Sequence, residues 1–194
     1  GLAEALHLSE KQSRKLVRKF LGEDFKSVIV RRRMELAMIY LGKNKTERRF
    51  TFKEMMKESS RTANYFKALG IKKGDRVLVL LKRHYQFWFT ILALHKIGAV
   101  IIPATNLLVK HDFDHRFEAG GVTAVVCTAD GDTAYQAELS MAEHPAVTTK
   151  IIVDGAKDGW HSFDDEFKLF TRHLSRPEDA SAGDDTALMF FTSG

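Results

Sequence analysis

The sequence has a single cysteine, Cys127, and only three prolines among its 194 residues. One cysteine excludes an internal disulfide and is typical of a protein kept in a reducing cytoplasm. Because Cys127 lies in the apolar run T-A-V-V-C-T, we interpret it as a buried small hydrophobic residue rather than a nucleophile. No apolar run approaches the roughly 18 residues of a membrane-spanning helix, and the N-terminus carries acids where an export signal would be apolar. The sequence therefore predicts a cytoplasmic protein without a membrane span.

The sequence has enough hydrophobic residues for an ordinary core, and its charged residues are unevenly distributed along the chain. Hydrophobic residues make up 44% of the chain and include 14 phenylalanines, which argues against disorder. Residues 1–49 hold 13 Lys/Arg against 6 Asp/Glu, whereas residues 50–194 hold 17 against 19. The basic N-terminal quarter, with Arg31–Arg33, could bind nucleic acid or another anionic surface. No aromatic residues interleave with these arginines as a stacking platform would require, so we favour a solvated helix face over nucleic-acid binding.

The N-terminal part of the chain reads as a helix followed by a hairpin. Residues 1–34 are predicted to form a helical, basic segment with one modest apolar face. The short apolar run Leu36–Leu41, a charged stretch and then Phe50-Thr51-Phe52 suggest a β-hairpin. Thr51 and Glu54 have the spacing of a capping box, which predicts the start of a helix that ends at Gly70.

From residue 50 onward, helices and strands alternate. Strands are predicted in apolar, β-branched runs at Arg76–Leu81, Ala99–Ile102, Thr123–Thr128, Lys150–Val153 and Ala187–Phe191. The intervening helices are predicted at Tyr85–Ile97, Asp112–Ala119 and Asp132–Glu143. This alternation indicates an α/β domain over residues 35–194, with a mainly parallel sheet flanked by helices. The run Ala187–Phe191 is of the kind that is normally a central strand covered on both faces.

Ligands of open α/β sheets bind beyond the carboxyl ends of the strands, where three loops are candidates. The first, Lys82-Arg83-His84, could meet an anionic tail but is more typical of a solvated strand end. The second contains Thr105 and Asn106. The third is Thr192-Ser193-Gly194, whose small hydroxyl and glycine residues would let backbone N–H groups approach a phosphate.

Three motifs, in order, resemble those of the adenylate-forming (AMP-binding) superfamily. The run A-L-M-F-F-T-S-G at the end of the chain is similar to the start of its phosphate loop, Y/F-T-S-G-(T/S)-T-G-x-P-K. Phe50–Met55 resembles the early T-(F/Y)-x-E-L motif, and Ala93–Thr105 the L-x-K-x-G-A-(V/Y)-x-(V/I)-P motif. Within this superfamily, the stretches R-R-F-T-F, Y-F-K-A-L-G and F-W-F most resemble the sequences of acyl-CoA synthetases of the short- and medium-chain type.

The resemblance implies a two-step reaction of a small carboxylic acid with ATP and CoA, assisted by Mg²⁺, through an acyl-adenylate. It implies that Thr192, Ser193 and Gly194 begin the cradle for the ATP phosphates. It also suggests that Thr105, Asn106 and Leu107 border the tunnel for the CoA thiol, although a turn after Pro103 would explain the same residues. The rest of the phosphate loop, the later acidic residues and the catalytic lysine are not in this sequence. We therefore expect an N-terminal fragment, without a catalytic residue and inactive without the missing C-terminal part.

Two alternatives to this function remain from the sequence. The chain could be an amino-acid-activating domain of the same superfamily, or a non-catalytic module that binds nucleic acid through its basic N-terminal quarter.

Two further patterns are weighed against their structural explanations. His111 and His115 have the spacing of a metal pair on one helical face, but no third ligand is evident, so metal binding is not expected. The aromatic residues of Tyr85–Leu94 could line an acyl pocket, but at helical spacing such residues more often fill a core.

Overall fold

The computed structural model describes residues 9–22, 27, 36–41, 45–175 and 178–192. These residues fall into two compact units, residues 1–54 and residues 55–194, which are considered separately below.

The first unit contains a helix and a hairpin. Helix α2 spans Glu10–Leu21 and begins with a capping box: Ser9 Oγ accepts from the Gln12 backbone N–H at 3.3 Å, and the Gln12 side chain accepts from the Ser9 N–H at 2.9 Å. Strands β1 (Leu36–Leu41) and β2 (Glu47–Thr51) pair antiparallel, which confirms the predicted hairpin. Of the helix predicted within residues 1–34, α2 is observed, and residues 1–8, 23–26 and 28–34 lie outside the described residues.

The capping box predicted at Thr51 and Glu54 is confirmed. The Thr51 N–H donates to Glu54 Oε2 at 2.8 Å, and the Glu54 N–H donates to Thr51 Oγ1 at 3.1 Å. These bonds satisfy backbone donors that have no partner in the first turn of a helix. Helix α4 (Phe52–Ala68) starts here and continues into the second unit.

The second unit is built on a five-stranded parallel sheet in the order β4-β3-β5-β6-β7. Its strands are β3 (Arg76–Leu80), β4 (Val100–Pro103), β5 (Ala124–Thr128), β6 (Thr149–Val153) and β7 (His161–Ser162). Strand β5 is buried along its whole length, and β3 along all but its first residue. Such burial on both faces requires the continuous apolar runs from which these strands were predicted.

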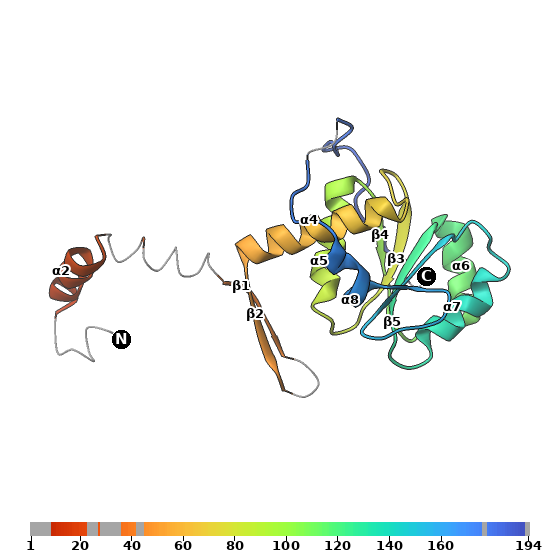
Figure 1. Ribbon diagram of the computed structural model, residues 1–194, viewed down its shortest axis with the longest axis horizontal. Helices are drawn as coiled ribbons and strands as arrows, with labels where there is room; N and C mark the ends of the chain where they lie inside the picture. Colours follow the sequence, from red (N-terminus) through yellow and green to blue (C-terminus); the bar gives the residue numbers. More distant parts are fainter. Residues whose placement is uncertain (1–8, 23–26, 28–35, 42–44, 176–177, 193–194) are drawn as a thin grey trace. The chain divides into compact units, whose positions relative to one another are not determined.

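Helices cover both faces of the sheet (Figure 1). Helices α4, α5 (Gln86–Ile97) and α8 (Phe163–Glu166) lie on one face. There Tyr65, Phe66 and Phe163 are fully buried against one another. Helices α6 (Lys110–Gly120) and α7 (Thr133–Met141) lie on the other face, and a short 3₁₀ turn, η1 (Phe167–Leu169), follows α8. The parallel α/β sheet flanked by helices is therefore confirmed.

Cys127 belongs to the core on the α6 and α7 face and is fully buried. Burial raises the pKa of its thiol to about 12, so the thiol stays protonated and unreactive at neutral pH. The interpretation of Cys127 as a small core residue is confirmed.

The last described segment, residues 187–192, differs from its prediction. It is extended but makes only an isolated parallel bridge, between Leu188 and Ile101 of β4. Met189 packs partly against the core, whereas Leu188 and Phe190 are 45% and 65% exposed. The expectation of a central strand covered on both faces is wrong, because the segment joins the sheet at the edge beside β4. Hydrophobicity alone does not reveal which strand lies at an edge.

Candidate functional site

The candidate site lies at the carboxyl edge of the parallel sheet. The connection after β3 leads to α5 on one face, whereas those after β4 and β5 lead to α6 and α7 on the other. Strand β3 is therefore the point at which the winding of the sheet reverses direction. At such a point the two loops diverge and leave a crevice, which is where open α/β sheets bind ligands.

The loop after β4 carries Thr105, Asn106 and Leu107. Thr133 Oγ1 of α7 donates to the Asn106 carbonyl at 3.0 Å, and the Thr105 hydroxyl accepts from the Leu107 N–H at 3.4 Å. The Leu107 side chain is 75% exposed. The loop is thus fixed to a neighbouring helix while an apolar side chain faces solvent, but a contact with CoA stays a prediction.

Thr192 emerges at the same edge. Because residues 187–191 run parallel to β4, they end at the carboxyl side of the sheet. The Phe191 ring anchors this end on α6, with its centroid 5.6 Å from that of the His115 ring and 5.3 Å from the Arg116 guanidinium carbon. Thr192 is exposed, whereas Ser193 and Gly194 lie outside the described residues. Their role in holding phosphates remains a prediction.

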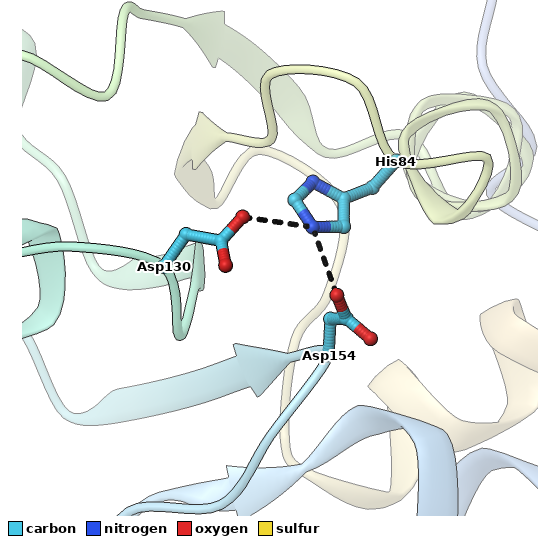
Figure 2. A group of neighbouring side chains, drawn as sticks. All are labelled: His84, Asp130 and Asp154. Carbon is cyan, nitrogen blue, oxygen red and sulfur yellow. Dashed lines mark ion pairs between the residues drawn. The ribbon is translucent and has the colours of Figure 1, made fainter. Parts of the chain in front are cut away.

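The sheet also brings together three side chains that the sequence did not link. His84 follows β3, Asp130 follows β5 and Asp154 follows β6, three strands that are neighbours in the sheet. In Figure 2 both carboxylates point toward the same imidazole nitrogen. Nε2 of His84 lies 3.8 Å from Oδ2 of Asp130 and 3.6 Å from Oδ2 of Asp154. We call these three residues the His84 cluster.

His84 was grouped with Lys82 and Arg83 as a solvated strand end, and for His84 this is wrong. Lys82 and Arg83 are exposed, but the His84 side chain is only 5% exposed. Its Nε2 lies 3.4 Å from the Thr128 hydroxyl, and its Nδ1 is buried with no hydrogen-bond partner among the described residues. The imidazole lies beyond the carboxyl end of β3 and is directed toward the Thr128 hydroxyl at the end of β5.

The backbones of the two aspartates in the cluster are held by hydrogen bonds to neighbouring side chains. The Asp130 N–H donates to Thr128 Oγ1 at 3.0 Å. The Asp154 N–H donates to Oδ2 of Asp164 at 2.8 Å, and Oδ1 of Asp164 accepts from Gln86 Nε2, also at 2.8 Å. Asp154 has a positive φ of 61°, so its left-handed backbone depends on this support.

A sequence signal for the cluster existed. Two of the predicted strands are each followed closely by Asp-Gly, at Asp130-Gly131 and at Asp154-Gly155. The spatial order of the strands, which the sequence does not state, was needed to connect these residues with His84.

The pair His111 and His115 does not form such a group. Both side chains are exposed, His111 beside Asp112 at 3.5 Å and His115 against the Phe191 ring. Within the described ranges, the set of three or more metal-capable side chains that converge is the His84 cluster. The expectation that His111 and His115 bind no metal stays a prediction.

Comparison with known proteins bears on the fold and the family. The family model for AMP-binding enzymes matches residues 25–194. Acyl-coenzyme A synthetase ACSM5, mitochondrial, of Rattus norvegicus is 30% identical over 151 residues, which are 77% of this chain and 25% of that protein. The 4-hydroxybutyrate--CoA ligase 1 of Metallosphaera sedula is 28% identical over 148 residues, 76% of this chain and 24% of that protein. This chain therefore spans about a quarter of the length of these curated relatives.

Two solved structures share the fold. The anthranilate CoA ligase AuaEII in complex with anthranoyl-AMP aligns with a TM-score of 0.69 at 19% identity, over 76% of this chain and 28% of that chain. The acyl-CoA synthetase of Brucella canis aligns with a TM-score of 0.71 at 22% identity, over 83% of this chain and 29% of that chain.

In the part of the chain that the structure describes, no helix is both long and apolar enough to cross a membrane. The rat relative is named as mitochondrial, so the cytoplasmic location stays a prediction.

The resemblance drawn from the three motifs is confirmed by the family match over most of the chain: the protein belongs to the AMP-binding enzyme family.

Proposed function

We propose that this chain forms the N-terminal α/β part of an AMP-forming acyl-CoA synthetase. The enzyme would convert a carboxylic acid, ATP and CoA to acyl-CoA, AMP and pyrophosphate. The observation that carries the proposal is the parallel bridge between Leu188 and Ile101, because it delivers Thr192 to the carboxyl edge of the sheet. The names of the relatives, acyl-CoA synthetase and CoA ligase, support the same reaction class.

In the proposed first step, a carboxylate oxygen attacks the α-phosphorus of ATP, and the bond from that phosphorus to pyrophosphate breaks. In the second step, the CoA sulfur attacks the acyl carbon, the thiol proton is lost and AMP leaves. Both steps place charge on phosphate oxygens, so hydrogen-bond donors fixed beforehand would contribute most to the rate. Mg²⁺ would arrive with the ATP phosphates and offset part of their charge, and we assign it no protein ligand.

The residues of this chain would bind and orient the substrates. The exposed Thr192 hydroxyl, with Ser193 and Gly194 after it, would donate to the β- and γ-phosphates. The anchored loop with Thr105, Asn106 and Leu107 would border the path of the CoA thiol. None of these residues removes or adds a proton in the proposal. Because the chain covers about a quarter of its relatives, we propose that it does not turn over alone.

The coding sequence after the Gly194 codon gives a direct test. A continuation that reads T-T-G-x-P-K would extend the phosphate loop, whereas a stop codon there would contradict the proposal. A protein translated through that continuation is expected to release pyrophosphate from ATP with acids between acetate and decanoate, and to form acyl-CoA when CoA is added.

The 194-residue chain is the matched control and is expected to give no rate above the blank. If the longer protein releases no pyrophosphate with any of the acids, the proposal is contradicted. Pyrophosphate release with amino acids alone would favour the amino-acid-activating alternative.

A further inference from the structure

The His84 cluster lies outside the residues to which the proposed reaction assigns roles. One imidazole nitrogen and one carboxylate oxygen from each aspartate all lie within 4.8 Å of one another. We propose that the cluster binds one divalent first-row transition-metal ion, such as Mn²⁺ or Zn²⁺.

The distances suit a shared cation better than direct hydrogen bonds. Two atoms bound to one ion at about 2.1 Å lie about 3.0–3.4 Å apart in octahedral or tetrahedral geometry. The two nitrogen–oxygen distances, 3.6 and 3.8 Å, are slightly longer than this. They are also beyond the range of a good hydrogen bond, so Nε2 is not bonded directly to either carboxylate. Small side-chain movements would close the group around an ion.

The burial of His84 is a second, independent observation. Its side chain is 5% exposed and directs Nε2 at the two carboxylates, while its other nitrogen is buried without a partner among the described residues. A histidine buried only for packing would be expected to have both nitrogens hydrogen-bonded. An ion bound to Nε2 would give that nitrogen a stronger partner than its 3.4 Å contact with the Thr128 hydroxyl.

The donor set selects the class of ion. Imidazole suits zinc and other first-row transition metals, whereas carboxylates also suit manganese. The side chains of Asp130 and Asp154 are 41% and 57% exposed, so an ion has access from solvent. Water can then fill the remaining coordination positions.

The backbone that carries each carboxylate is fixed before an ion arrives. Thr128 fixes the backbone of Asp130, and Asp164 fixes that of Asp154. Groups behind the ligands commonly raise metal affinity in this way, because less freedom is lost on binding. An ion would then link the loops after β3, β5 and β6 across the point where the sheet reverses its winding.

The test is a titration of the EDTA-treated chain with Mn²⁺, followed by electron paramagnetic resonance, without nucleotide, CoA or acid. We expect one saturable Mn²⁺ per chain, displaced by Zn²⁺. Because nothing in this experiment depends on the ligase reaction, its failure is distinct from failure of the proposed function. Binding that does not saturate, in protein shown to be folded by circular dichroism, would overturn the proposal.

Two variants remove one ligand each. Asp154→Gly keeps the fold, because glycine adopts a φ of 61° without strain and retains the N–H that donates to Asp164. Asp130→Asn removes the charge of the other carboxylate. Each is expected to weaken Mn²⁺ binding by roughly tenfold or more. Undiminished binding by both variants would overturn the proposal and leave the cluster as an ion pair.

The matched control is the double variant His111→Asn and His115→Asn. It removes the exposed pair with metal-like spacing and is expected to bind Mn²⁺ as the unchanged chain does. Loss of binding in this variant, with retention in Asp154→Gly, would assign the ion to α6 instead and refute the site at the His84 cluster.

Discussion

Gly121 provides a prediction with a magnitude that follows from geometry. It ends α6 at a φ of 58°, where a Cβ atom would lie 2.6 Å from Nη1 of Arg76. That nitrogen donates to the Gly120 carbonyl at 3.0 Å. In Gly121→Ala the left-handed backbone costs about 1–2 kcal/mol. Displacing the charged donor costs about 1–2 kcal/mol more. The lower entropy of the unfolded alanine chain offsets about 0.4–1 kcal/mol, so we expect a net loss of about 2 kcal/mol.

Gly70→Ala is the matched control, because Gly70 has a φ of 87° and a Cβ atom added there would meet nothing within 4 Å. It should lose only the backbone part, about 1 kcal/mol. Urea unfolding followed by tryptophan fluorescence measures both, since Trp88 and Trp160 lie in the second unit. In an Arg76→Ala background, Gly121→Ala should cost no more than Gly70→Ala. An excess that survives without Arg76, or no excess at all, would refute the reasoning.

Four further predictions concern the second unit. The buried Cys127 thiol should react with Ellman's reagent more than about 100-fold faster in urea than in the native state, and equal rates would contradict its burial. Trp160→Phe removes the 2.6 Å bond from the indole to Glu138 and should cost about 1–3 kcal/mol in urea unfolding. Although partial burial opposes it, hydrogen bonds from Trp160 and a lysine lower the pKa of Glu138. The ionised Glu138 therefore stabilises the fold above about pH 4.3, and this contribution is lost as the pH falls further. Glu138→Gln should flatten that part of the plot of unfolding free energy against pH, and an unchanged slope would contradict the role of Glu138. Phe163→Ala should lower the free energy of unfolding by about 3–5 kcal/mol, because Phe163 is fully buried. Phe190→Ala should lower it by less than about 0.5 kcal/mol, because Phe190 is 65% exposed, and similar losses for the two variants would contradict the assigned core.

The regular elements were predictable because their signals are local. Strand β5 is buried at every position and reads as A-V-V-C-T, and Gly98 and Gly121 end α5 and α6 with positive φ angles. The two-residue strand β7 was missed, since two residues cannot show a period. The segment 187–191 was predicted as central because its apolar residues resemble those of β5, but the position of a strand within a sheet depends on distant partners.

The candidate site was predictable in part for the same reason. The loops after β4 and after Phe191 were assigned to the carboxyl edge from strand direction alone. His84, Asp130 and Asp154 meet only because β3, β5 and β6 are adjacent in the sheet. Neither the order of the strands nor the inward turn of His84 is encoded in any short motif.

The edge formed by residues 187–191 has a consequence for handling the protein. An extended edge with apolar side chains is a template onto which another chain can add, and proteins usually blunt such edges with charge. Here the exposed side chains of Leu188 and Phe190 are apolar and carry no charge. Concentrated solutions of the 194-residue chain should therefore aggregate through this edge before the sheet itself unfolds. A lysine in place of Leu188 would be the smallest change that keeps such solutions clear.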